Sequence, residues 1–283
     1  NNLMNAIFPS LFISKKLTEK QEIQFNVSRK INRPGFRQLM PFIIALDPKN
    51  YLIGNPNLTP EFITLSELNF NQYLKNGNLF FSLFYRNTQN PITAFIQPSA
   101  VDPTILVNTS INGKQSHTIG MDNTFKYTLF KGFESTFNMN LFYVLINANY
   151  KSVIATNEGF NYNGKLNLAY KLPKSFSLQL SGNYESPRII PQGKTKEMYF
   201  ADFGISKDLF KFMTLTASVS DIFDTKGRGM SYATDYYLQD SWNRRESRFV
   251  RLIVRVRFGK ADATIFRTRP HSQQSDDGDG GFF

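Results

Sequence analysis

The sequence predicts an all-β protein, a transmembrane antiparallel β-barrel of which about eleven strands are visible in this chain. Three observations predict it. Apolar and polar residues alternate with a period of two, aromatic residues gather near the ends of the alternating segments, and short and long connections follow each other in turn. Aromatic residues make up 15% of 283 residues while the mean hydropathy is −0.33, a balance that fits the core of a soluble enzyme poorly.

The alternation is clearest between Phe160 and Leu172, where even positions are mostly large and apolar and odd positions are mostly Asn or Lys. The segments 133–145, 175–184 and 250–258 repeat this pattern. A soluble sandwich would alternate too, but these segments run about 10 to 14 residues, as a tilted membrane-crossing strand requires. We therefore expect the apolar face to contact lipid and the polar face to line a wet lumen.

Aromatic side chains occur in pairs near the two ends of the apolar faces. The pairs are Phe125 and Tyr127, Phe133 and Tyr143, Phe160 and Tyr170, and Phe176 and Tyr184. Transmembrane barrels carry such aromatic girdles at both lipid–water interfaces. The pairs therefore favour a membrane barrel over an aromatic sandwich core.

Short turns are expected at 18–20, 73–77, 130–132, 173–174 and 208–211, and longer connections at 31–60, 87–114, 148–159, 187–196 and 223–246. The strands between them are 6–16, 22–30, 61–72, 78–88, 115–129, 133–147, 160–172, 175–186, 197–207, 212–222 and 247–258. Short periplasmic turns and long outer loops alternate in this way in outer-membrane barrels, whose strand number is normally even. An odd count implies a strand upstream, so we expect this chain to be the C-terminal portion of a barrel.

Composition excludes several kinds of site. The chain has no Cys and only two His, His117 and His271, so it predicts no disulfide, no metal site and no thiol or imidazole catalysis. Since no catalytic constellation is visible, we expect no enzyme and no cofactor. The net charge of +11 suits an anionic ligand or membrane surface. Nucleic-acid binding is not expected, because the Lys and Arg residues are spread along strands and loops without a compact motif.

Several motifs resemble those of TonB-dependent outer-membrane receptors, especially the outer-membrane β-barrel family of Bacteroidetes-type bacteria. The most specific is Gly54-Asn55-Pro56-Asn57-Leu58-Thr59-Pro60-Glu61, supported by Asp221-Ile222-Phe223-Asp224 and by Arg255-Val256-Arg257-Phe258-Gly259. The resemblance implies a 22-stranded barrel in the bacterial outer membrane, of which this chain would be the C-terminal half. It also implies import of a nutrient, which is a glycan, a peptide or a metal chelate.

The resemblance implies two domains and several partners. Residues 1–259 would be barrel, and residues 260–283 would be a flexible polar periplasmic tail. Expected partners are outer-membrane lipid and lipopolysaccharide, a plug domain upstream in the same polypeptide with TonB acting through it, and a surface lipoprotein or other complex subunits. The alternative is a barrel without transport activity that serves as a structural or adaptor subunit of an outer-membrane complex.

The segment 31–60 is rich in Pro and cannot be a central strand, so it is expected to be a long loop without regular structure. It either contacts substrate in the lumen or caps the outer mouth. Basic residues on the polar faces either pack against the plug or steer anionic substrates, and those near the outer mouth bind lipopolysaccharide if they face outward. The ligand-binding candidates are Arg29, Arg33, Arg37, Gln38, Tyr51, Asn55, Asn57, Arg251, Arg255 and Arg257.

Overall fold

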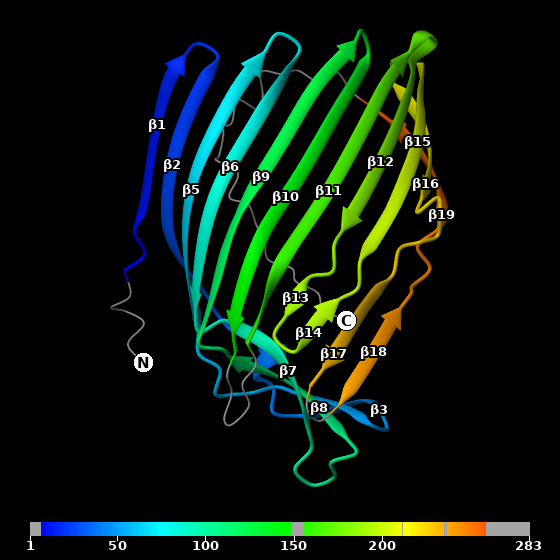
Figure 1. Cartoon of the computed structure of the whole chain (residues 1–283). Coiled ribbons are helices and arrows are strands. Elements are labelled where there is room, and N and C mark those ends of the chain that lie inside the picture. The colour runs from blue at the N-terminus through cyan, green and yellow to red at the C-terminus, as the bar shows by residue number, and fades with distance from the viewer. Residues whose placement is uncertain (1–6, 149–155, 211, 235–236, 259–283) are drawn as a thin grey trace.

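A computed structural model of the chain describes residues 7–148, 156–210, 212–234 and 237–258. Its main element is an eleven-stranded antiparallel sheet that curves like part of a barrel wall (Figure 1). In sheet order the strands are β1 (Ser10–Thr18), β2 (Gln21–Asn32), β5 (Glu61–Leu74), β6 (Gly77–Gln89), β9 (Gln115–Phe130), β10 (Phe133–Asn147), β11 (Thr156–Leu172), β12 (Phe176–Glu185), β15 (Met198–Phe210), β16 (Met213–Ser220) and β19 (Phe249–Val256). Each strand pairs with the next strand in this order, so β1 and β19 form the two edges of the described sheet.

All eleven predicted strands are confirmed, because a long period-two pattern is specific to a strand with one apolar and one polar face. The strand boundaries differ by a few residues. The largest differences are at β1, which begins at Ser10 where 6 was predicted, and at β11, which begins at Thr156, inside the connection expected at 148–159. The tail expected at 260–283 lies outside the described residues.

The ladder registers place the apolar side chains of neighbouring strands on one face. Leu141 of β10 pairs with Met121 of β9 and with Tyr162 of β11, while Asn140 pairs with Asp122 and with Asn163. Side chains directly opposite each other in a ladder point to the same side. One side of the sheet, the apolar face, is therefore rich in aliphatic and aromatic residues, and the other, the polar face, is rich in Asn, Ser and Thr.

Rings cluster near both ends of the apolar face. At the short-turn end, Phe130 stacks on Phe133 with 5.0 Å between ring centroids and meets Tyr170 edge-on at 5.6 Å. At the long-loop end, Tyr143 meets Phe160 at 4.9 Å, and Tyr162 stacks on Tyr184 at 5.6 Å. The two ring clusters have the arrangement expected of aromatic girdles.

The long connections are more ordered than the sequence predicted. The segment 31–60 was expected to lack regular structure, but it holds α1 (Phe36–Leu39), β3 (Ile43–Asp47) and β4 (Asn50–Ile53). The other connections hold β7 (Ile92–Pro98), β8 (Leu106–Asn112), β13 (Ile189–Ile190), β14 (Gly193–Thr195), β17 (Arg228–Ala233) and β18 (Leu238–Asn243). These strands form two further sheets, β3-β4-β8-β7 and β13-β14-β17-β18. The prediction was wrong because these short strands depend on distant pairings, such as the parallel contact of β4 with β8.

The helices are few and short. In the described parts of the chain, α1 spans four residues and a 3₁₀ turn covers Pro173–Ser175. No helix in the described ranges is long and apolar enough to cross a membrane.

Candidate functional site

Both small sheets lie over the polar face where the long connections meet. Phe95 of β7, Ile111 of β8 and Ala148 form a buried cluster, and Ile146 packs against it from the polar face of β10. Nearby, the Asn157 amide of β11 donates to the carbonyl oxygens of Ile190 and Gly193, at 2.7 and 2.9 Å. The long connections therefore fold inward over the polar face, and Figure 1 shows β7, β8 and β3 gathered at this end of the sheet. The two small sheets, β3-β4-β8-β7 and β13-β14-β17-β18, are together called the loop mouth below.

The two small sheets are joined by one side chain. Gln192 accepts a hydrogen bond from the backbone N–H of Ile96 at 2.7 Å and donates to the Ile96 carbonyl at 2.8 Å. Gln192 is 8% exposed and Ile96 is 4% exposed, so both partners are shielded from water. A buried amide that satisfies both groups of one residue makes a strong and directional link.

The Gly54-to-Glu61 motif ties the connection 31–60 to the connection 87–114. The Asn55 amide donates to the Ser110 carbonyl at 3.1 Å, and the Thr59 backbone exchanges two hydrogen bonds with the Asn112 side chain, both at 2.8 Å. Glu61 accepts from the backbone N–H of Ile92 at 2.8 Å. These residues hold the root of the loop mouth, which gives Asn55 a structural role that the sequence did not reveal.

Gly54 is required where the loop closes on α1. A Cβ atom at Gly54 would lie 2.4 Å from the Met40 carbonyl oxygen and 2.8 Å from that of Arg37, closer than any side chain permits. The Gly54 N–H donates to Met40 at 2.8 Å, and the Asn55 N–H donates to the Gln38 carbonyl at 2.6 Å. The predicted ligand residue Gln38 also uses its side-chain oxygen locally, accepting from the Gly35 N–H at 2.8 Å.

The remaining candidates in the first half of the chain are dispersed. Arg29 lies on the apolar face, because it pairs with Thr64 between the ladder positions of Val27 and Ile31, and its guanidinium sits 5.2 Å from the Phe62 ring centroid. The other candidates are exposed or half-buried: Arg33, Arg37 and Asn57 are exposed, and Tyr51 is half-buried in β4. Arg29 therefore faces outward near the rim, away from the lumen candidates.

The candidates at the end of the chain lie on or beside β19. Arg251 pairs with Ser218 and Arg255 with Thr214, and both positions belong to the polar face. The Arg251 guanidinium lies 5.1 Å from the ring centroid of Phe249, a neighbour on the same face. Arg257 follows the strand and donates its backbone N–H to Phe212 at 2.7 Å. The expected polar-face placement is thus confirmed for Arg251 and Arg255, and their ligand role stays a prediction.

A buried carboxylate organises the connection that follows β16. Asp221 is 1% exposed and accepts hydrogen bonds from the backbone N–H groups of Thr225 and Lys226, both at 3.0 Å, and from the Ser247 hydroxyl at 2.5 Å. Burial raises the pKa of Asp221, but these donors outweigh burial and hold it below its ordinary value. Beside it, Asp224 forms ion pairs with Arg244 and Arg248. The Asp-Ile-Phe-Asp motif therefore holds the start of this connection, at Thr225 and Lys226, to its end, at Arg244, Ser247 and Arg248.

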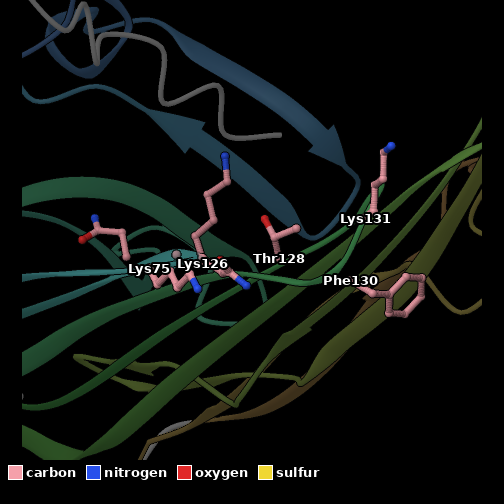
Figure 2. Close-up of a pocket in the computed structure, with 8 residues that line it drawn as sticks. Lys75, Lys126, Thr128, Phe130 and Lys131 are labelled. Atoms are coloured by element: carbon pink, nitrogen blue, oxygen red, sulfur yellow. The ribbon is translucent and has the colours of Figure 1, made fainter.

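A basic hollow lies at the opposite, short-turn end of the sheet. It has a volume of about 610 Å³ and is lined by Lys75, Asn76, Gly77, Asn78, Lys126, Thr128, Phe130 and Lys131. Figure 2 shows Lys126 and Lys131 extending to the same side while Phe130 lies apart from them. The Lys126 ammonium lies 3.6 Å from the Glu134 carboxylate, so one of the three lysines has an acidic partner.

The described residues contain no group of three His, Cys, Asp or Glu side chains placed to hold a metal ion. His117 instead contacts a tyrosine on the apolar face. Its Nδ1 lies 2.8 Å from the Tyr85 hydroxyl, and the two rings stack with 6.1 Å between centroids. The described chain thus forms a curved sheet with its long connections folded over one end of the polar face.

Comparison with known proteins agrees with this architecture. The model of the outer membrane protein beta-barrel family matches residues 1–258. Among solved structures, the copper transporter OprC matches with a TM-score of 0.63 at 12% identity, covering 89% of this chain and 39% of that one. The ferric yersiniabactin uptake receptor FyuA from Yersinia pestis gives 0.59 at 14% identity, covering 89% and 37%. The siderophore receptor PirA from Pseudomonas aeruginosa gives 0.56 at 18% identity, covering 78% and 38%.

The chain spans 37 to 39% of the length of these three receptors. At such low identities the likeness shows the fold. No curated protein matches the sequence.

Proposed function

Because the chain belongs to the outer membrane protein beta-barrel family, it lies in the bacterial outer membrane with its apolar face against lipid, and we propose that it is the barrel portion of a nutrient receptor. In this proposal the loop mouth captures the nutrient, which then passes along the polar face. A plug domain upstream in the same polypeptide would block the lumen until TonB displaces it. No enzymatic step is needed.

The observation that supports transport most strongly is the inward fold of the long connections over the polar face. A barrel that only holds a complex together has no need for a lumen-side mouth, whereas a receptor must gather its ligand there. The Gln192 link to Ile96 fixes the relative position of two connections in that mouth. The polar face below it offers Asn, Ser and Thr side chains, which hydrogen-bond to a polar solute without a strong charge barrier.

The polar face carries basic residues together with acidic ones such as Asp122 and Glu134, so it suits polar nutrients without selecting one sign of charge. Arg251 and Arg255 lie on β19, and Lys126 and Lys131 lie toward the short-turn end. Arg29, on the outward side of the rim, is placed to meet the phosphate groups of lipopolysaccharide.

The test is nutrient uptake in the native bacterium. Cells with the wild-type gene, with the gene deleted, and with TonB deleted would be grown on defined media that each limit one nutrient class: glycan, peptide or metal chelate. The proposal expects both deletions to abolish growth on the same medium. If loss of the gene leaves growth on every medium unchanged but disrupts an outer-membrane complex, the adaptor alternative is correct.

A further inference from the structure

Trp242, the only tryptophan of the chain, is partly exposed to solvent. It lies on β18 and pairs with Gly229 of β17, in the sheet whose first strand packs over the polar face of β11. Its side chain is 50% exposed. A half-exposed indole beside charged groups has an apolar surface and polar neighbours, the combination that ligand sites use to bind and orient a ligand.

The indole also lies close to the main chain at Gly227 and Gly229. A Cβ atom at Gly227 would lie 2.4 Å from the indole Cζ2, and one at Gly229 would lie 2.6 Å from Cε3. Any side chain at these two positions would push the ring away. The two glycines therefore let the indole lie close to the main chain around β17, while half of its surface stays exposed to solvent.

Charged and polar side chains lie beside the indole. Lys196 lies 5.9 Å from the ring centroid and forms an ion pair with Asp240 at 2.8 Å. The other Asp240 oxygen accepts from the Ser231 hydroxyl at 2.7 Å. The Asp240 side chain is 65% exposed, so its carboxylate retains lone pairs for a ligand. The hydrogen bond from Lys196 lowers the pKa of Asp240, which keeps it ionised.

We propose that Trp242, Lys196, Asp240 and Ser231 form a sugar-binding platform that takes one pyranose ring of a neutral glycan. A pyranose has an apolar C–H face and a rim of hydroxyl groups. Its C–H groups carry partial positive charge and meet the negative face of the indole, while its hydroxyls donate to Asp240 and accept from Lys196. The paired opposite charges of Lys196 and Asp240 favour neutral hydroxyls over an anionic chelate. This inference rests on the proposed receptor function and names glycan as its substrate class.

The experiment is calorimetric titration of the whole protein that contains this chain, purified in detergent, with maltohexaose, cellohexaose, xylohexaose and laminarihexaose. At least one is expected to bind, and Trp242→Ala is expected to weaken that binding about tenfold or more, as loss of a stacking platform does. Trp242→Phe, which keeps an aromatic face, should weaken it less than Trp242→Ala. Phe223→Ala is the matched control, because Phe223 is exposed in the same connection and lies outside the platform.

The proposal is overturned if none of the four hexasaccharides binds, or if Trp242→Ala binds them as tightly as the wild type. It is also overturned if ferric dihydroxybenzoate binds in a Trp242-dependent manner and the hexasaccharides do not. Uptake distinguishes this failure from failure of the receptor function. If the gene supports TonB-dependent growth on a peptide or chelate medium and Trp242→Ala leaves that growth unchanged, the receptor function stands and the sugar platform is refuted.

Discussion

Gln192 and Ile96 are 96 residues apart in sequence, yet the Gln192 side-chain amide satisfies both the N–H and the C=O of Ile96. The contact joins β7 to the turn between β13 and β14 and is buried on both sides. Because β7 and the β13–β14 turn belong to different small sheets, this amide fixes the position of one small sheet relative to the other.

Gln192→Leu should destabilise the contact between the two small sheets without unfolding the eleven-stranded sheet. Leucine has a similar volume but cannot hydrogen-bond, so two buried backbone groups of Ile96 lose their partners, at a cost of about 1 to 3 kcal/mol each. Amide hydrogen exchange at Ile96 is expected to accelerate at least tenfold. Gln97→Leu is the control, since Gln97 alternates to the opposite side of the same strand. Unchanged exchange at Ile96 would show that the amide is not what holds β7.

The two faces of β10 predict opposite responses to an introduced charge. Leu141 lies on the apolar face near the middle of the strand, so Leu141→Arg should lower the free energy of unfolding in lipid by about 2 to 4 kcal/mol. Asn140 lies on the polar face, and its amide donates to the Asp122 carboxylate. Asn140→Arg should cost less than about 1 kcal/mol, because its charge stays hydrated and near a carboxylate. Denaturant titration of both variants in liposomes checks this, and equal costs would contradict the assignment of faces.

Asp221 predicts a pH-dependent contribution to stability. Its pKa in the folded protein lies below the ordinary value of 3.8, so its stabilising effect is complete above that value and is lost as pH falls through the folded pKa. Asp221→Asn, which tolerates the positive φ of 47° at this position, should cost about 1.5 to 3 kcal/mol at pH 7. The difference in free energy of unfolding between wild type and Asp221→Asn should become smaller under acid conditions.

Denaturant titration of wild type and Asp221→Asn from pH 7 downward measures this difference. Asp47→Asn is the comparison and should show a smaller difference at pH 7, because Asp47 also accepts two hydrogen bonds in a turn but is exposed to solvent. A difference for Asp221→Asn that does not change with pH would mean that the carboxylate charge is not responsible.

The eleven wall strands could be predicted because each repeats its pattern over many residues. In β10 alone, Phe137, Met139, Leu141 and Tyr143 alternate with polar neighbours and specify both the strand and its lipid side. The strands of the loop mouth could not be predicted in this way. β13 is only two residues long, and its position depends on Asn157 and Asn161 of β11.

The candidate site was predicted only in part. The alternation along β19 correctly placed Arg251 and Arg255 on the polar face. Gln192 carried no signal, because a single Gln in a polar connection looks the same whether it is buried or exposed. The ligand role of Asn55 stays a prediction, and its bond to Ser110 could not be foreseen, since the distant connection 87–114 supplies an acceptor that a local pattern cannot show.

Spin labelling of β10 can establish which face of the sheet meets lipid and which lines a wet lumen. The chain has no Cys, so single cysteines can be placed at each position from 137 to 143 and spin-labelled in the whole protein reconstituted in lipid. Odd positions should be accessible to oxygen dissolved in the bilayer, and even positions to a water-soluble nickel reagent. Accessibility without a period of two, or with its phase reversed, would contradict the account.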